Sequence, residues 1–581
     1  MALAWMIYAL LAVAYFGWGK TAADLLGLGG PGTRFVTFHV WIGWALTLFI
    51  FQLIHFVLPI TALVVIPVLA IGVAAAAPGI VKAARGRSAS PPRSPPILPL
   101  SIGAGLLAVS GWLASRSMLP PEIYDSGLYH FNKIRWINSF PMVPGLGNLH
   151  GRLAFNQSFF TYVAALNFHP LFGHGRSIAN SFMLLLTMAT FIDLSRPAIE
   201  RPPHGAEAHP FQFASIVILS PVLVYLAFSS PGLTSPSPDL TSTLLQLTMF
   251  LVLAQGVGNW TRGQTDQDDR ALLLGILATS ALTVKLSNLA FCATVLAFVL
   301  FYARRARSRR VVLRTVLLCA MVTAVWCLQS IILSGAPLYP STIGYVRADW
   351  SVPRESIVDE ANRIFSWARQ PSAHWSTVLG NSNWFEPWLH RVSTDVVNVV
   401  FPLATSVILS MMTAATWRLK IGKRPSFLEW SIVLPALVGL AYWFFSAPDP
   451  RFAAGMFFIL SACSTLLLFS SLHSMIGRRT YVVCMCVVFV VANVHFWAYL
   501  VKHGRAITSI SVSGWHPVKP IALDQKVTVS GLSVYTPTTG DQCWDSPLPS
   551  TPHFKPQLRL RNPRSLSSGF TVEPEPEQIP P

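Results

Sequence analysis

Long uninterrupted runs of apolar residues constrain this sequence more than any other feature. They recur along most of the chain, and a helix that crosses a bilayer needs about 20 mostly apolar residues. We therefore predict about fourteen membrane-spanning helices. Their approximate bounds are 2–18, 35–58, 60–81, 97–115, 172–194, 211–229, 240–256, 271–284, 287–303, 311–333, 396–416, 428–446, 453–472 and 480–500.

Composition supports a membrane protein of the all-α polytopic class. Of the 581 residues, 52% are hydrophobic and only 11% are charged, whereas a soluble domain usually has about 25% charged residues. The mean hydropathy is +0.51. A chain of this composition is neither disordered nor typical of a soluble enzyme.

Basic residues predict how the bundle is oriented. With the spans given above, every basic cluster falls on one side, which the positive-inside rule makes cytoplasmic. The clusters are at 82–93, 304–310, 418–424 and 478–479. The net charge of +18 therefore reports topology, and no nucleic-acid partner is expected. Both termini are predicted to be extracytoplasmic.

The chain divides into four predicted regions. The N-terminal region 1–96 holds three spans and a basic, Pro-rich linker, and the transmembrane core at 97–500 includes outer loops 116–171 and 334–395. The tail at 501–570 contains two β-like runs, at 526–529 and 532–535, and so predicts a small strand-containing appendage. The segment 571–581 is rich in Pro and Glu and is predicted to be disordered.

Three local patterns refine this organisation. The stretch 152–169 is partly apolar but contains three amide side chains, so we predict an interfacial or re-entrant helix there. The middle of the second outer loop, 355–369, is predicted to be helical. Only Cys543 of the seven cysteines lies in an outer segment, and one cysteine cannot form an internal disulfide there.

Soluble-enzyme motifs are missing from the sequence. It contains no Walker loop, HExxH or GxSxG sequence. Any chemistry is therefore expected from side chains at the outer membrane boundary.

The segment 121–130 (PEIYDSGLYH) supplies the first candidate site. Glu122 and Asp125 directly follow the fourth predicted span, and Tyr124 and His130 flank Asp125. A carboxylate at a dry boundary can have a raised pKa and act as a general base. The motif by itself, however, favours a structural role in which Asp125 caps the following helix.

Asp239 and Lys285 are further candidates. Asp239 ends the turn Ser-Pro-Ser-Pro-Asp before a span, where an N-cap role is favoured over a chemical one. Lys285 separates two short apolar segments, a costly position unless the ammonium reaches water, a carboxylate or a phosphate. Contact with a phosphate and simple snorkelling to the interface both remain open for Lys285.

Two outer segments contain candidate arginines. In APDPRF (447–452), two prolines form a turn that presents Asp449 and Arg451 together. Arg451 either binds a lipid phosphate through its fork of donors or forms a local salt bridge. Arg347 lies in loop 334–395 among aromatic and amide residues, which suit both a sugar-binding surface and an interfacial belt.

Together these features resemble the GT-C glycosyltransferases, a class of polytopic membrane enzymes that use polyprenyl-linked sugar donors. Asp125 matches the acidic position of that class in the first long outer loop. The resemblance implies a GT-C-like core in which Asp125 is the catalytic base and Lys285, Arg451 and Arg347 bind the donor phosphate. This chain departs from the class in two ways: three extra spans at 1–81 precede the common core, and Asp125 lacks the paired carboxylates that several members of the class have. A divalent metal is therefore a possible cofactor but not the favoured one.

Three motifs also resemble an uncharacterised bacterial family of large membrane proteins. They are YDSGLYH at 124–130, PDPRF at 448–452 and GDQCWD at 540–545. This resemblance covers about residues 97–570 and implies a multi-pass protein of the bacterial inner membrane. It is specific for a family but does not define a reaction.

We therefore expect a membrane glycosyltransferase acting on the extracytoplasmic face. The expected partners are membrane lipid, a polyprenyl-phosphate sugar donor, and a glycan, lipid or protein acceptor with a free hydroxyl. Glu122, Tyr124, His130, Asp239 and Asp449 are supporting candidates. One alternative is an O-antigen-type polymerase or ligase, for which loop 334–395 supplies arginines and a histidine. The other is a lipid or glycan transporter, which would place polar residues along a path through the bilayer midplane.

Overall fold

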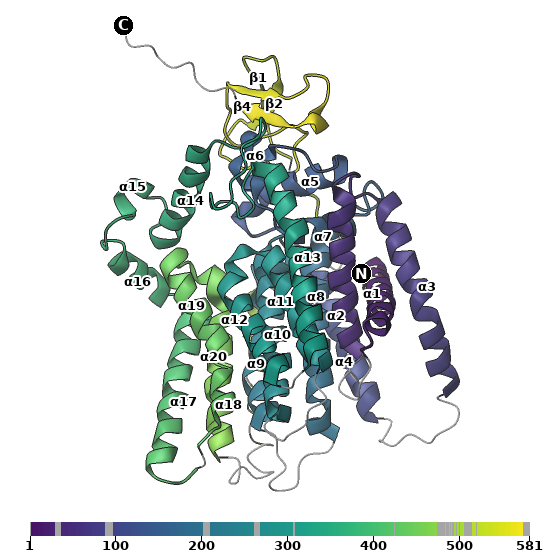
Figure 1. The fold of residues 1–581 in the computed structure, drawn as a ribbon, viewed down its shortest axis with the longest axis vertical. Helices are drawn as coiled ribbons and strands as arrows, with labels where there is room; N and C mark the ends of the chain where they lie inside the picture. The colour runs from purple at the N-terminus through teal and green to yellow at the C-terminus, as the bar shows by residue number, and fades with distance from the viewer. Residues whose placement is uncertain are drawn as a thin grey trace.

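A computed structural model defines the fold. It describes residues 2–28, 36–86, 97–200, 210–260, 268–305, 308–422, 424–472, single positions between 483 and 504, 514–518 and 520–572. The described chain is mainly α-helical, with short strands near its C-terminal end (Figure 1).

The helices follow the apolar runs of the sequence. In the first half they are α1 (Ala2–Leu25), α2 (Val36–His55), α3 (Ala62–Gly86), α4 (Ile97–Ser117), α5 (Phe131–Ser139), α6 (Leu146–Leu149), α7 (Ser158–Leu166), α8 (Gly175–Glu200), α9 (Pro210–Ser229), α10 (Pro238–Trp260) and α11 (Asp268–Val284). In the second half they are α12 (Leu289–Arg305), α13 (Arg309–Ser334), α14 (Arg354–Arg369), α15 (Trp375–Val378), α16 (Phe385–Ser393), α17 (Phe401–Arg418), α18 (Phe427–Ser431), α19 (Leu434–Ser446) and α20 (Pro450–Leu472).

Ten helical segments among the described residues are long and apolar enough to cross a membrane, by length and composition. A multi-pass membrane protein is therefore confirmed. Helices α4, α9 and α11 occupy three of the other predicted spans but are not among these ten segments. The predicted span at 480–500 lies largely outside the described residues.

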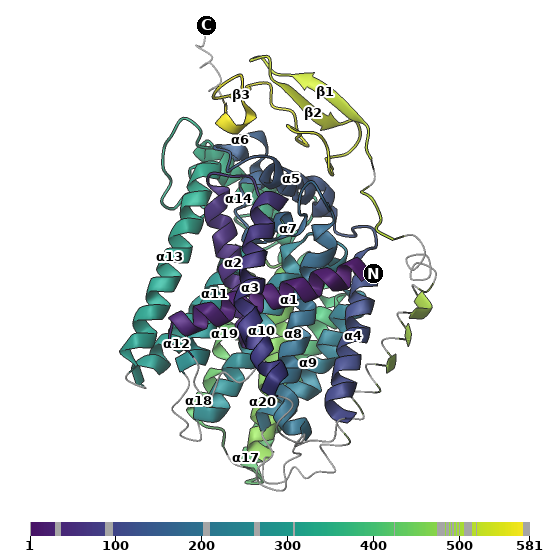
Figure 2. The same ribbon diagram turned by 90° about the vertical axis from the view of Figure 1, so that its right-hand side faces the viewer.

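Helix α1 crosses α2 and α3 at close range. Figure 2 shows α1 running obliquely across these helices, whereas Figure 1 shows it nearly end-on. Glycines make the crossing possible: a Cβ atom at Gly17 would lie 1.8 Å from the Gly72 carbonyl oxygen, and one at Gly43 would lie 1.8 Å from that of Tyr15. Small residues commonly let membrane helices approach in this way.

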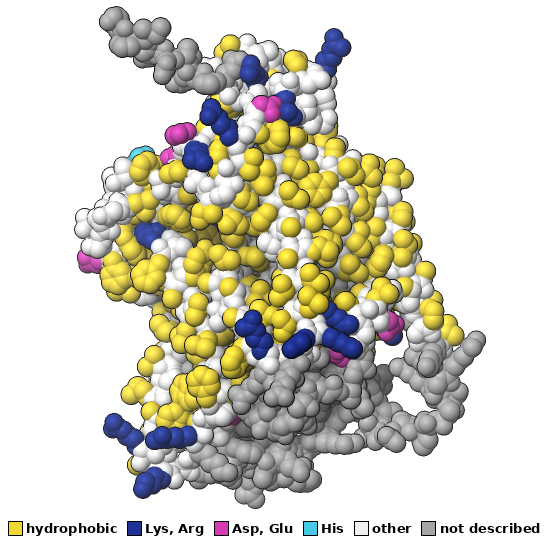
Figure 3. Space-filling model, viewed as in Figure 1, with side chains coloured by type: hydrophobic (Ala, Val, Ile, Leu, Met, Phe, Trp, Pro, Cys, Tyr) yellow, Lys and Arg dark blue, Asp and Glu magenta, His cyan; other side chains and the backbone are white. Residues whose placement is uncertain are grey.

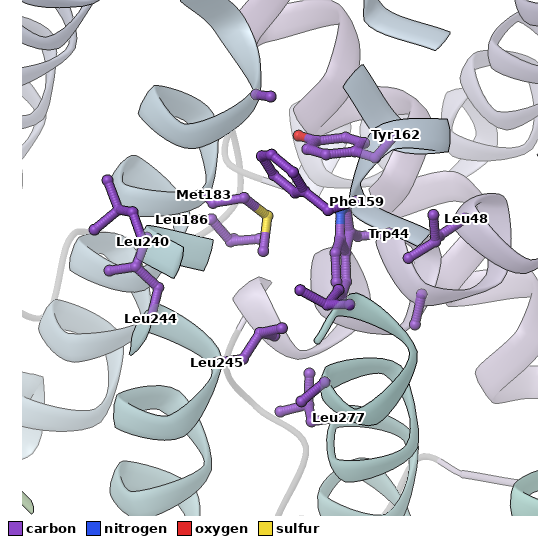
Figure 4. Packing of buried hydrophobic residues seen from close by; sticks show 14 of the residues in the cluster. Trp44, Leu48, Phe159, Tyr162, Met183, Leu186, Leu240, Leu244, Leu245 and Leu277 are labelled. Carbon is purple, nitrogen blue, oxygen red and sulfur yellow. The ribbon is translucent and has the colours of Figure 1, made fainter. Parts of the chain in front are cut away.

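The core lies where α2, α7, α8, α10 and α11 meet. Figure 4 shows Trp44, Phe159, Met183, Leu244 and Leu277 converging there from those five helices. All five side chains are fully buried. Dense packing of this kind holds the outer ends of the helices in fixed positions.

The stretch 152–169, predicted to hold an interfacial or re-entrant helix, contains α7. All nine residues of α7 are buried, against α2, α5, α8 and α11. Two of the three amide side chains beside α7, those of Asn156 and Asn167, donate hydrogen bonds inside the protein. The Asn156 Nδ2 donates to the Trp326 carbonyl oxygen at 2.7 Å, and the Asn167 Nδ2 donates to the Asn138 Oδ1 at 2.8 Å.

The C-terminal tail forms the predicted strand-containing appendage. Strands β1 (Leu523–Val527) and β2 (Ser533–Pro537) pair antiparallel, as do β3 (Leu558–Leu560) and β4 (Phe570–Val572). The prediction of disorder from 571 onward is wrong for Thr571 and Val572, because the buried Phe570 anchors their strand against Trp136 at a ring-centroid distance of 5.7 Å. Residues 573–581 lie outside the described residues.

The two ends of the molecule differ. Helices α5–α7 and α14–α16 lie with the strands at one end (Figure 1), and α14 confirms the predicted helix in the second outer loop. On the face that Figure 3 shows, apolar side chains form a belt across the middle of the molecule, and Lys and Arg side chains lie below this belt and also at the strand-bearing end. We call the strand-bearing end the outer end.

Candidate functional site

Asp125 forms the centre of a charged cluster at the outer end. It directly precedes a short π-helix, η2 (Ser126–His130). Its Oδ1 accepts a hydrogen bond from the Arg152 Nη1, and its Oδ2 accepts one from the Arg451 Nη1, each at 3.0 Å. The side chain makes no capping hydrogen bond. Asp125 therefore does not act as a helix cap, because both of its oxygens are held by guanidinium groups.

Further ion pairs extend this cluster into the second outer loop. The Arg152 Nε lies 3.6 Å from the Glu360 Oε1 of α14. On the other side, the Arg451 Nε lies 3.7 Å from the Asp449 Oδ1, and the Asp449 Oδ2 pairs with the Arg391 Nη1 of α16 at 3.3 Å. Ion pairs thus connect the loop 334–395 to the segment that contains Asp125.

Asp239 and Lys285 form a direct ion pair beside Arg451. Asp239 lies inside the first turn of α10, so its carboxylate binds the ammonium and does not cap the helix; its own amide donates to the Ser237 Oγ at 3.3 Å. Lys285 lies at the break between α11 and α12. The N-cap interpretation of Asp239 is therefore wrong, because helix α10 begins one residue earlier, at Pro238.

Phe452 connects this pair to Arg451. The Lys285 Nζ lies 4.1 Å from the centroid of the Phe452 ring, and the Arg451 guanidinium carbon lies 4.8 Å from the same centroid. Cations at such distances are attracted to the face of an aromatic ring. Asp125, Asp239, Lys285 and Arg451 consequently belong to one cluster, although they come from four segments of the chain.

The charges of the cluster set the protonation of Asp125. Burial of the side chain opposes ionisation, but Arg451 and Arg152 outweigh it and hold the pKa of Asp125 below its usual value. The carboxylate is therefore ionised at neutral pH.

His130 is held neutral beneath the cluster. Burial lowers the pKa of His130 to about 4, even though Asp125 and Asp239 act in the opposite direction. Its ring packs against Tyr129 and Phe160, with centroids 4.4 and 5.1 Å away. His130 therefore supports the cluster as an uncharged packing residue.

The C-terminal tail supports the Asp125 segment from outside. The Tyr124 hydroxyl donates to Asp541, and the Gln542 Nε2 donates to the Tyr124 carbonyl oxygen at 2.8 Å. The Trp544 amide donates to the Gly127 carbonyl oxygen at 2.8 Å, and a Cβ on Gly127 would lie only 2.6 Å from the Trp544 ring. Gly127 is therefore required for this contact.

Three sequence motifs thus converge at the outer end. GDQCWD contacts YDSGLYH through the tail bonds above, and PDPRF contacts it through Arg451. Glu122 stabilises the same segment: its carboxylate pairs with Arg116 at 3.0 Å, and its amide donates to the Ser235 Oγ at 3.1 Å. The supporting candidates from the sequence accordingly lie in or next to the cluster.

Arg347 lies elsewhere. It lines a separate cleft between the second outer loop and the strand-containing tail. Conversely, sequence reasoning missed Arg152, Glu360 and Arg391. A guanidinium within the partly apolar stretch after residue 151 was a usable signal for Arg152, because such a group needs an acidic partner. Nothing local distinguishes Glu360 or Arg391 from ordinary exposed charges.

Four cations and four carboxylates make up the cluster. They are Arg152, Lys285, Arg391 and Arg451 with Asp125, Asp239, Asp449 and Glu360. Among the described residues, no group of three or more His, Cys, Asp or Glu side chains is placed to hold a metal ion. An incoming anion can instead compete for a guanidinium, and the Arg451 side chain is 40% exposed.

The fold and this cluster define a multi-pass helical membrane protein with a charged site at its outer end. Residues 1–460 match the family described as "Domain of unknown function (DUF8201)", and the chain therefore belongs to that family. The matched region contains Asp125, Asp239, Lys285 and Arg451. No curated protein matches the chain, and no solved structure matches it.

Proposed function

We propose that this protein is a membrane glycosyltransferase that moves a sugar from a polyprenyl-phosphate donor to a hydroxyl acceptor. One observation carries the proposal: Asp125, Asp239, Lys285 and Arg451 form a single cluster at the outer end of the helices. Such a cluster combines two carboxylates with two cations of the kind that bind phosphate, and the Arg451 side chain is 40% exposed.

The donor phosphate binds Arg451 and Lys285 in this proposal. A guanidinium matches the geometry of phosphate oxygens, and an ammonium adds a compact positive charge. Both groups then stabilise the negative charge that the leaving phosphate gains. Their present partners, Asp125 and Asp239, are displaced in part when the phosphate binds.

Displacement from Arg451 activates Asp125. Burial by itself raises the pKa of this carboxyl, and the nearby guanidinium groups keep it low. When the phosphate occupies Arg451, the pKa of Asp125 rises and the carboxylate becomes a stronger base. The acceptor oxygen then attacks the anomeric carbon, the bond to the phosphate breaks with its electron pair on the phosphate, and Asp125 takes the hydroxyl proton.

The same proposal assigns roles to the helical bundle, to α14–α16 and to α1. The helices form a GT-C-like bundle of about fourteen spans in a bacterial inner membrane, with both termini and the outer end extracytoplasmic. Helices α14–α16 cover the site and exclude water. Helix α1, packed across α2 and α3, belongs to a region added before the transferase core.

Transfer by purified protein tests the proposal. The full chain in detergent is incubated with radiolabelled polyprenyl-phosphate hexoses and pentoses and with membrane extracts as acceptor. Replacing Asp125→Asn is expected to reduce transfer at least about 100-fold, as loss of a general base typically does. Asp524→Asn is the matched control, because this exposed residue of β1 lies in the strand-containing tail.

Each outcome of this experiment discriminates between functions. Full activity of Asp125→Asn would exclude Asp125 as the base. Transfer only from polyprenyl-diphosphate oligosaccharides would identify an O-antigen-type polymerase or ligase instead. Absence of transfer from every donor, together with movement of labelled lipid across reconstituted vesicles, would establish a transporter.

A further inference from the structure

A second polar cleft lies at the outer end, between the loop after α13 and the strand-containing tail. Its volume is about 1300 Å³. Tyr345, Arg347 and Ser351 line it from the loop, and Ser533, Gln557 and Arg561 line it from the tail. Ligand pockets for drug-sized molecules usually measure about 300–1,000 Å³, so this cleft has room for a larger, extended ligand.

The cleft is positively charged. Its lining residues include three arginines, Arg347, Arg559 and Arg561, and a single carboxylate, that of Asp349. Asp349 pairs with Arg561, whose Nε lies 2.5 Å from its Oδ2 and whose Nη2 lies 3.3 Å from its Oδ1. Arg347 is exposed and has no carboxylate partner in the part of the chain that the structure describes.

Two aromatic rings lie beside arginines at or next to the cleft, and of these four residues Tyr345 and Arg561 line it. The Arg561 guanidinium carbon lies 4.9 Å from the centroid of Trp350, and the Arg354 guanidinium carbon lies 4.8 Å from that of Tyr345. Hydroxyl and amide groups also line the cleft, together with apolar side chains such as Val529, Leu532 and Leu560. An acidic sugar is recognised by three kinds of protein group. Aromatic rings stack on the sugar, polar groups bond to its hydroxyls, and guanidinium groups bind its carboxylate.

Both walls of the cleft are tied to the helical core. The Asn148 Nδ2 donates to the carbonyl oxygens of Trp350 and Phe570, at 2.8 and 3.1 Å. The Thr571 Oγ1 donates to the Asp349 carbonyl oxygen at 2.7 Å. The cleft is therefore a preformed feature, because the loop and the tail share these bonds. Figure 3 shows Lys and Arg side chains at this end of the molecule, beyond the apolar belt.

We propose that this cleft binds an acidic glycan, through carboxylate-bearing sugar units. Its position beyond the apolar belt favours a water-soluble polymer over a lipid headgroup. Its polar lining does not suit an apolar peptide. The inference concerns binding alone and does not depend on sugar transfer at Asp125.

Binding of a fluorescent oligogalacturonate to the full chain in detergent tests this proposal. A neutral maltooligosaccharide and inorganic polyphosphate are the comparison ligands. Oligogalacturonate is expected to bind, to bind more weakly at high salt, and to bind better than either comparison ligand. Tighter binding of polyphosphate, or equal binding of the neutral sugar, would overturn the proposal.

Variants that reverse a single charge test whether oligogalacturonate binds in this cleft. Arg347→Glu is expected to weaken oligogalacturonate binding at least about tenfold, because a charge-assisted hydrogen bond is replaced by repulsion. Arg418→Glu, at the last residue of α17, changes the net charge equally and is expected to leave binding unchanged. Arg347→Gln removes the positive charge without introducing a negative one, and it is also expected to weaken binding, though less than Arg347→Glu does. If Arg347→Glu and Arg418→Glu weakened oligogalacturonate binding equally, the effect would be one of net charge, and the proposal that the ligand binds in the cleft would be refuted.

Discussion

At the residue scale, buried charges in this protein are stabilised by specific partners. The Lys285 side chain is only 12% exposed and the Asp239 side chain 20%, so each needs the other. Removing one member of a buried pair leaves an uncompensated charge, which costs more than the pair itself contributes.

A double-mutant cycle tests this coupling. Lys285→Met or Asp239→Asn alone is expected to lower the free energy of unfolding by about 3 kcal/mol, the lower end for a broken buried pair. The combined variant is expected to lose clearly less than the sum of the two, measured by thermal unfolding in detergent.

An exposed pair provides the comparison for that cycle. Lys20 and Asp24 are ion-paired at 2.5 Å on α1, but their side chains are 45% and 58% exposed. Lys20→Met is expected to cost less than about 1 kcal/mol, as surface pairs usually do. Additive losses at Lys285 and Asp239 would contradict the assignment of one coupled pair.

At the element scale, close helix crossings depend on single glycines. Gly72 and Gly79 both lie on α3. A Cβ on Gly72 would lie 2.4 Å from the Ala14 carbonyl oxygen, whereas one on Gly79 would meet only a Phe16 ring carbon at 3.9 Å. The same substitution therefore has opposite expected effects at two positions of one helix.

Alanine substitutions distinguish these two positions. Gly72→Ala is expected to force α1 and α3 apart and to destabilise the protein by about 1–3 kcal/mol, the usual cost of overpacking. Gly79→Ala is expected to be neutral or stabilising by up to about 1 kcal/mol, because alanine is the better helix former. Equal melting temperatures for the two variants would show that the crossing is looser than the structure has it.

At the scale of the whole molecule, the C-terminal tail supports the charged cluster at the outer end of the helices. The tail reaches across more than 400 residues of sequence to bond with the segment around Asp125. Its contribution is positional, because its groups contact the backbone of that segment and the Tyr124 hydroxyl, whereas the Asp125 carboxylate oxygens bind Arg152 and Arg451.

Loss of the tail contact is expected to loosen the site. Trp544→Ala removes a half-buried ring from beside Gly127 and is expected to cost about 2 kcal/mol, roughly half the cost of deleting a fully buried Trp. Hydrogen exchange of the η2 and α5 amides should then accelerate. Trp367→Ala on α14, where the ring is 50% exposed, should leave this exchange unchanged. Unaltered protection in the Trp544 variant would mean that the tail does not brace the site.

Much of the fold was determined by the sequence itself. The apolar runs located the helices, the middle of the second outer loop was recognisable as α14, and the tail runs matched β1 and β2 within a few residues. These features are predictable because hydropathy and periodicity act over neighbouring residues. The sequence also identified Asp125, Asp239, Lys285 and Arg451 as charges at the ends of apolar segments.

Only the tertiary structure decided which of these charges meet. Asp125 bonds to Arg451 across 326 positions, and Asp239 pairs with Lys285 across 46, whereas Arg347 lies in another cleft. Local sequence favoured helix caps for both aspartates, because a cap needs only adjacent residues. Ion pairs between distant segments depend instead on how the helices pack. That packing brings Arg451 to Asp125 and Lys285 to Asp239, so each carboxylate binds a cation and does not cap a helix.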